Sequence, residues 1–181
     1  MKKLMALIAL VAMVAVSSVA FAQSGTVSVS GTVGSTLTVD DCTASFGTIA
    51  VGSVTNAQCT HSYSSNSSSG YTLTFAATND TLDHDTESHT IDALTAADCS
   101  TQAAECFSYD WGTSDGDGSD NITGETAIPT GAGTAVYTGA GAGDVAVGET
   151  STFDFYAWAE SSTDAGTYSL TGGSLTVAAQ P

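Results

Sequence analysis

Four cysteines are the side chains best suited to chemistry in this 181-residue sequence: Cys42, Cys59, Cys99 and Cys106. They lack the C-x-x-C or Cys/His spacing of a zinc site, so oxidation to two disulfides is the chemistry they predict. Three pairings are possible. Proximity in sequence favours Cys42 with Cys59 and Cys99 with Cys106, and closing the first loop is expected to contribute about 3 kcal/mol.

Residues 114–121 form an oxygen-rich segment with the sequence Ser-Asp-Gly-Asp-Gly-Ser-Asp-Asn. The carboxylates of Asp115, Asp117 and Asp120 suit calcium, a hard cation that takes six to eight oxygen ligands. An EF-hand would need glycine where Asp120 stands, and no flanking helices are expected. A solvated acidic loop is therefore the favoured interpretation, with calcium as the alternative.

A second polar segment lies at residues 83–89. If it is extended, Asp83, Asp85, Glu87 and His89 share one face while His84 points away. Imidazoles and carboxylates together suit zinc or copper. A polar hairpin tip is the simpler interpretation, and we prefer it.

The signal for catalysis in the sequence is poor. No Ser/His/Asp arrangement stands out, so we expect a protein that is not an enzyme. Aromatic residues offer a further possibility, an aromatic sugar-binding surface, although core packing is the usual role of such side chains. The residues concerned are Tyr63, Tyr109, Trp111, Tyr156 and Trp158.

The only two basic side chains, Lys2 and Lys3, precede an apolar run over residues 4–16 and the triplet Ala20-Phe21-Ala22. This is the pattern of a bacterial secretory signal peptide over residues 1–22, cleaved before Gln23. The alternative is an uncleaved anchor, but the run is shorter than the roughly 20 apolar residues that a bilayer requires. We expect residues 23–181 to form one secreted domain, extracellular or on the cell surface, with no membrane attachment after cleavage.

The expected mature chain carries all 19 acidic residues and no lysine or arginine. Nucleic acid and anionic lipid are excluded as partners because both need basic side chains to neutralise phosphate. Lys/Arg salt bridges are likewise excluded. Burial, backbone pairing and disulfides must therefore hold the fold, and an oxidising compartment permits those disulfides.

Alternation with a period of two predicts β-strands along most of the chain. Tyr71, Leu73 and Phe75 share one face of a strand. In residues 150–160, Asp154, Tyr156 and Trp158 lie on one face, and the opposite face carries Phe153, Phe155, Ala157 and Ala159.

Other segments predict loops and irregular strands. Around Gly172-Gly173 the apolar alternation slips by one residue, which indicates a bulge or a tight hairpin. Residues 112–148 predict long Gly/Ala/Asp-rich loops around one or two short strands near Val136, and residues 62–70 and 79–88 predict further loops. The expected fold class is all-β, an immunoglobulin-like antiparallel β-sandwich.

Residues 23–33 form an uncharged segment with Val27, Val29, Gly31 and Val33 on one face. Two interpretations fit this pattern equally. The segment is either the first strand of its own domain, or a donor strand whose valines fill pockets in a neighbouring subunit.

Two blocks of sequence resemble the spore coat U domain, which is similar to the subunits of chaperone–usher pili. The first is Asp41-Cys42-Thr43-Ala44-Ser45-Phe46-Gly47, followed by Cys59 and Gly70-Tyr71-Thr72-Leu73. The second is Phe155-Tyr156-Ala157-Trp158, followed by Ala165-Gly166-Thr167-Tyr168-Ser169.

The resemblance implies a secreted immunoglobulin-like sandwich, a disulfide between Cys42 and Cys59, and polymerisation by strand donation. The expected function is a structural subunit of an extracellular fibre, pilus (fimbrium) or surface coat. Its partners would be further copies or homologous subunits, with a periplasmic chaperone during export. The alternative is a monomeric secreted module that binds calcium or a glycan.

Overall fold

The structure is a computed structural model that describes residues 30, 31, 33, 36–67, 69–102, 104–113, 119–139 and 146–179. The chain divides into two units, Met1–Val33 and Gly34–Pro181, and every strand belongs to the second. In the first unit the described residues are Ser30, Gly31 and Val33, which are exposed and outside any strand. The expected signal peptide and the valines Val27 and Val29 lie outside the described residues.

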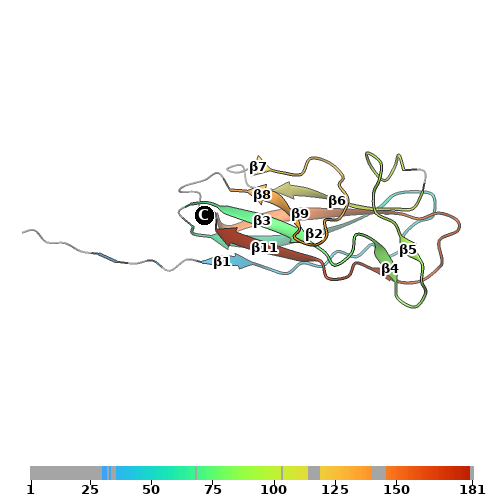
Figure 1. The fold of residues 1–181 in the computed structure, drawn as a ribbon, viewed down its shortest axis with the longest axis horizontal. Coiled ribbons are helices and arrows are strands. Elements are labelled where there is room, and N and C mark those ends of the chain that lie inside the picture. Colours follow the sequence, from blue (N-terminus) through green and yellow to red (C-terminus); the bar gives the residue numbers. More distant parts are fainter. Residues whose placement is uncertain are drawn as a thin grey trace, which may run out of the picture. The chain divides into compact units, whose positions relative to one another are not determined.

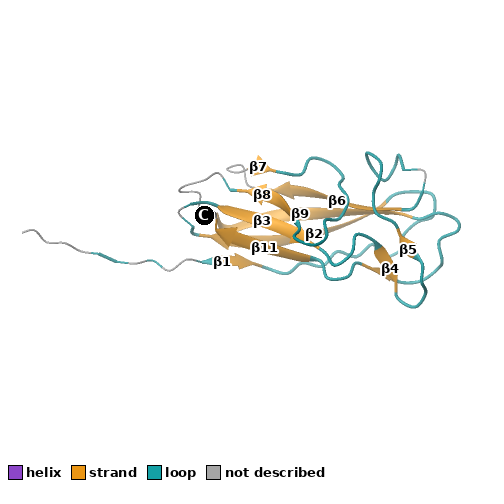
Figure 2. Ribbon diagram, viewed as in Figure 1, coloured by secondary structure: helices purple, strands orange, loops and turns teal. Residues whose placement is uncertain are grey.

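The described part of the chain is all-β, as the alternation predicts, and contains no helix (Figure 2). All pairs of named strands are antiparallel. In chain order the strands are β1 (Leu37–Val39), β2 (Thr55–Ser65), β3 (Tyr71–Ala76), β4 (Leu82–His84), β5 (Thr90–Ile91), β6 (Cys106–Thr113), β7 (Ser119–Asp120), β8 (Thr134–Thr138), β9 (Ala146–Trp158), β10 (Tyr168–Ser169) and β11 (Ser174–Ala179).

The strands form three sheets (Figure 1). One four-stranded sheet has the order β1-β2-β9-β6, and the other has the order β11-β3-β8-β7. A three-stranded sheet, β10-β4-β5, lies beyond them. The long β2 and β9 strands form the centre of the first sheet, where Thr55 pairs with Ala157 and Cys59 with Phe153.

Aromatic side chains from the two four-stranded sheets pack against each other and form the core. Tyr63 of β2 contacts Tyr71 of β3 with ring centroids 5.7 Å apart, and Phe75 of β3 contacts Phe153 of β9 at 4.7 Å. Tyr109 of β6 is also buried, and burial raises the pKa of its hydroxyl to about 12. These contacts explain why β2 and β3 bury every second residue along most of their length.

Two disulfides join the pairs that sequence proximity favours. Cys42 is bonded to Cys59 of β2, with a Cα–Cα distance of 5.6 Å, and Cys99 is bonded to Cys106 of β6 at 5.4 Å. No described cysteine is free. The first bond attaches the chain after β1 to the core, and the second fixes the loop before β6 to the outside of the first sheet.

Several expected boundaries differ from the structure. The hairpin alternative at Gly172-Gly173 is wrong, because β10 pairs with β4 while β11 pairs with β3, so the chain passes from one sheet to the next. The expected loops also contain strand residues: β2 continues to Ser65, β4 lies within 79–88, and β9 begins at Ala146. Backbone pairing with neighbouring strands stabilises these residues although their side chains give little apolar signal.

Candidate functional site: an open groove between two sheet edges

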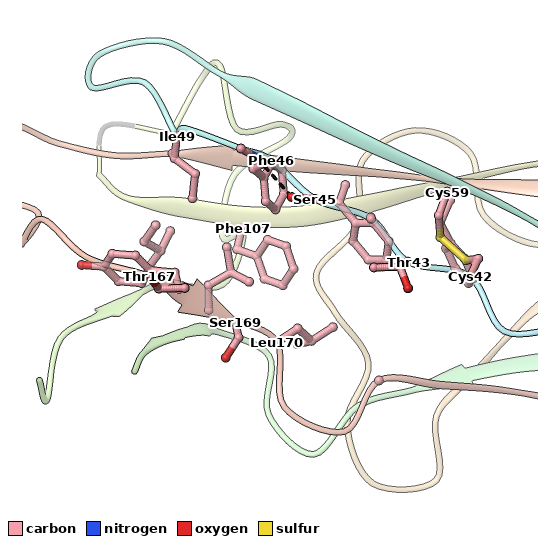
Figure 3. A pocket seen from close by; sticks show the side chains of 18 of the residues that line it. Cys42, Thr43, Ser45, Phe46, Ile49, Cys59, Phe107, Thr167, Ser169 and Leu170 are labelled. Atoms are coloured by element: carbon pink, nitrogen blue, oxygen red, sulfur yellow. Dashed lines mark hydrogen bonds between the residues drawn. A yellow bond between two sulfur atoms is a disulfide. The ribbon is translucent and has the colours of Figure 1, made fainter. Parts of the chain in front are cut away.

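A large groove, of about 880 Å³, opens between the two four-stranded sheets on one side of the core. One wall is the extended chain at residues 39–49, and the opposite wall is residues 163–170 with 173–175. Aromatic and aliphatic side chains form the floor, namely Phe75, Leu82, Ile91, Phe107, Phe153 and Phe155. Figure 3 shows Phe46 and Ile49 on one side, Thr167 and Leu170 on the other, and Phe107 between them.

The first wall continues from β1 as an extended chain with alternating exposure. Cys42, Ala44 and Phe46 are half-buried against the core, while Thr43 and Ser45 are exposed. Within the described residues, the backbone of residues 41–50 forms no hydrogen bond to any other backbone segment. The wall thus has the side-chain periodicity of a strand without a strand's partner.

Side-chain contacts hold this wall in place instead of a backbone ladder. The Cys42–Cys59 disulfide attaches it to β2, and Phe46 packs edge-on against Phe107 of β6 with ring centroids 6.3 Å apart. Both contacts involve side chains only. Among the described residues, the one backbone hydrogen bond within the wall beyond Asp40 is from Gly47 N to Ser45 Oγ, so the wall's other N–H and C=O groups are free of backbone partners.

The second wall is built from β10, β11 and the turn that precedes them. Among the described strands, β10 is hydrogen-bonded only to β4, and β11 only to β3, so neither has a hydrogen-bonded strand on its other side, although β1 lies close to β11. Tyr168, Leu170 and Leu175 are partly buried apolar residues that pack against the core from this wall. The groove therefore lies between two edges that face each other unpaired.

The other long edge of the first sheet is covered. Phe107 N donates to Asp92 O at 2.7 Å, and Leu94 N donates to Phe107 O at 3.0 Å. Tyr109 and Thr126 exchange two further backbone hydrogen bonds, at 2.9 and 2.7 Å. An exposed sheet edge can pair with another chain. In this fold the β6 edge of the first sheet is covered, whereas the edge beside the groove is open to such pairing.

His61 of β2 lies in the groove floor and is 3% exposed. Its ring is 5.2 Å from that of Trp111 and 5.5 Å from that of Phe153, and its Nδ1 atom is 4.0 Å from Cys42 Sγ. Its Nε2 atom is buried with no hydrogen-bond partner. Burial lowers the pKa of His61, and the carboxylate of Asp40 opposes this effect.

Two further histidines brace the second wall. His84 Nδ1 accepts hydrogen bonds from the backbone N–H groups of Thr86 and Glu87, at 3.1 and 3.0 Å. The proton of a neutral His84 is therefore on Nε2, which lies 3.4 Å from Ala165 O in the turn of the second wall. A Cβ atom added to Gly166 would lie 1.8 Å from His84 Nε2, so the turn needs glycine for this close approach.

His89 also supports the second wall of the groove, through the carboxylate of Glu105. Its Nε2 atom is 2.9 Å from Glu105 Oε1, and the hydroxyl of Thr163 donates a hydrogen bond to that oxygen. The hydrogen bond to Glu105 raises the pKa of His89. His84 and His89 thus position the groove wall, and among the described residues no three His, Cys, Asp or Glu side chains converge to hold a metal ion.

The residues predicted from sequence fall in different places. Gly31 and Val33 are described, and Val33 is 87% exposed. Of the candidate calcium ligands, Asp115 and Asp117 lie outside the described residues, while Asp120 is in β7, where burial raises its pKa. Calcium binding remains a prediction.

The sequence does not predict the groove or the place of His61 in its floor. β2 carries few large apolar residues, and its inward positions include Cys59, His61 and Ser65. The only indication of this strand in the sequence is that its small or polar inward residues alternate with outward Asn, Gln and Thr. This pattern is weaker than the alternation of Val, Phe and Tyr that identifies the other strands.

Comparison with known proteins gives no match to a family model, to a curated protein or to a solved structure. None of the described residues belongs to a helix long and apolar enough to cross a membrane. The groove itself is therefore the main structural indication of function.

Proposed function

We propose that this chain is a secreted structural subunit of an extracellular fibre, pilus or surface coat, in which residues 23–33 of one copy fill the groove of the next. The observation that carries the proposal is the pair of facing, unpaired edges on either side of an apolar floor. An added strand completes such a gap by backbone pairing, and its alternate side chains fill the pockets beneath it.

The strand order supports an immunoglobulin-like sandwich that lacks its last strand. In that fold the strands run A-B-E-D in one sheet, and C, F and G form the other. The order β1-β2-β9-β6 corresponds to A-B-E-D, and β11 lies beside β3 as F lies beside C. The position of strand G is then beyond β11, where the groove opens.

Residues 23–33 suit this position in length and pattern. At about 3.3 Å per residue the segment spans about 36 Å, the same length as the extended wall at residues 39–49. Val27, Val29 and Val33 would face the floor, with Gly31 allowing a close approach, while Ser and Thr face solvent. The segment carries no charged side chain, so none of its side chains brings a charge into the apolar groove.

A donor from a second copy is favoured over the chain's own segment. Only residues 34–36 separate the segment from β1, so its own groove is reached only by an immediate hairpin. That hairpin fixes the register against the wall, whereas a segment from another copy is free to choose the register and direction that bury its valines.

The decisive experiment compares polymer formation by three variants of the mature protein. Deletion of residues 23–33 should leave a folded monomer, and a synthetic peptide of these residues should then raise its melting temperature. Ala44→Trp should block the groove and abolish polymers, because Ala44 faces the core from the wall. Thr43→Trp is the matched control, since Thr43 is exposed, and it should polymerise normally.

Polymers that persist after the deletion would refute donation from this segment. Equal polymerisation of Ala44→Trp and Thr43→Trp would refute the groove as the acceptor. A mature protein that stays monomeric at all concentrations, and is destabilised by the deletion, would show that the segment fills its own groove. Size-exclusion chromatography and negative-stain microscopy distinguish these outcomes.

A further inference from the structure

The outer face of the β1-β2-β9-β6 sheet carries a second constellation, separate from the groove. On β9, Asp154, Tyr156 and Trp158 follow one another on the side away from the core and are each half-buried. Alternate residues of a strand lie about 7 Å apart, so the two aromatic side chains and the carboxylate form a row.

Polar side chains flank this row on both neighbouring strands. Asn56 and Gln58 of β2 pair in register with Tyr156 and Asp154, and both donate amide hydrogen bonds to Asp154 Oδ1, at 3.4 and 2.9 Å. On the other side, Asp110 of β6 pairs directly with Asp154. The amide oxygens of Asn56 and Gln58 remain available as acceptors on an exposed surface.

The second disulfide makes this face rigid. Cys106 pairs in register with Trp158, and its partner Cys99 packs in a small cluster to which Tyr156 and Trp158 also belong. Glu125 supports the same loop by accepting hydrogen bonds from Cys99 N at 2.9 Å and Ser108 Oγ at 2.7 Å. Aromatic side chains fixed in this way lose little conformational entropy when they bind a ligand.

The placement of Asp110 opposite Asp154 excludes several occupants. Like charges directly across a ladder are destabilising, and the described chain has no lysine or arginine to offset them. A second copy would add further carboxylates to this face, and an anionic glycan would be repelled. A neutral ligand that donates many hydrogen bonds relieves the unfavourable pairing.

We infer that this face binds a neutral saccharide. The aliphatic C–H face of a pyranose ring packs on Tyr156 and Trp158, and its hydroxyl groups donate to Asp154 and Asp110 and bond the amides of Asn56 and Gln58. This combination of flat apolar surface with in-plane acceptors is the chemistry that a sugar presents. In the proposed polymer such faces would recur with every subunit, and weak single contacts would add through multivalency.

The test titrates the exported chain, residues 23–181, with neutral hexasaccharides of glucose, mannose and N-acetylglucosamine, followed by calorimetry and saturation-transfer NMR. Sugar binding is measured separately from polymer formation, so failure of this inference is distinguishable from failure of strand donation. At least one sugar should bind at millimolar concentration. Tyr156→Ala and Trp158→Ala should each weaken binding about tenfold, the loss of one aromatic contact. Val147→Ala, at an exposed β9 position, is the control and should change nothing.

Trp158→Phe keeps an aromatic ring at this position and should retain most of the affinity. It shows whether Trp158→Ala weakens binding through the lost aromatic contact or through a change in the structure of the face. Absence of binding by the whole panel would overturn the inference. So would binding that survives both alanine substitutions. A calcium isotherm obtained without sugar and abolished by Asp110→Asn would assign the face to a cation instead, and would also overturn it.

Discussion

Acidification should destabilise this protein through His61, and replacing His61 by leucine should remove that sensitivity. The imidazole is buried between the rings of Trp111 and Phe153, with Nε2 unpartnered. A proton on His61 would place a positive charge in the apolar floor of the groove. The negative charge of Asp40 favours protonation, but the effect of burial is larger. Leucine has a similar volume and cannot be protonated.

The magnitude follows from proton linkage. In the unfolded chain His61 titrates at its ordinary pKa of 6.5, while burial lowers the pKa in the folded protein. The unfolded state therefore binds more protons as the pH falls below about 6.5, and folded stability decreases until the folded pKa is reached. Between pH 8 and pH 5.5 the loss approaches about 1.4 kcal/mol if the folded His61 stays neutral throughout.

The assay is urea unfolding of the oxidised, deletion-variant monomer at pH 8 and pH 5.5, followed by tryptophan fluorescence. The wild-type sequence should lose more stability than His61→Leu between these two values, by up to about 1.4 kcal/mol. Carboxylate titration is common to both proteins and cancels in the comparison. If both proteins change equally, His61 does not titrate as a buried neutral group, and the described groove floor is wrong.

Three further outcomes are expected. Gly166→Ala should cost about 1–3 kcal/mol because its Cβ meets the His84 ring, and a thermal melt that stays unchanged would refute that contact. Glu105→Gln should destabilise the protein below pH 6.5, where His89 is charged, with the effect fading as the pH rises through the raised pKa of His89. A pH-independent effect would contradict the His89–Glu105 ion pair. Finally, the exported chain should melt at a higher temperature in added salt, which screens its unopposed carboxylates, and differential scanning fluorimetry at low and high ionic strength checks this.

The sequence predicted the strands whose inward residues are large and apolar. Phe153 and Ala157 of β9 are buried, while Asp154 and Trp158 lie on the other face, as the alternation indicates. β2 escaped prediction because its inward positions include Cys59 and His61, so only its pairing with β9 identifies it as a strand.

The aromatic residues show the same limit. Trp111 and Trp158 are the same residue type, and each lies in a strand, Trp111 in β6 and Trp158 in β9. Trp111 faces the core and is 3% exposed, whereas Trp158 lies half-buried on the outer face of the sheet. The alternation along a strand shows which residues share a face. Which of the two faces packs against the other sheet depends on how the two sheets assemble.

By itself the sequence determined the fold class, the favoured cysteine pairs and the absence of basic side chains after Lys3, because alternation, spacing and composition are local properties of the chain. Only the tertiary structure decided that residues 39–49 face residues 163–170 and 173–175 across an open groove. An edge is open or covered according to which distant strand lies beside it. That choice depends on the whole sheet order, which no local pattern encodes.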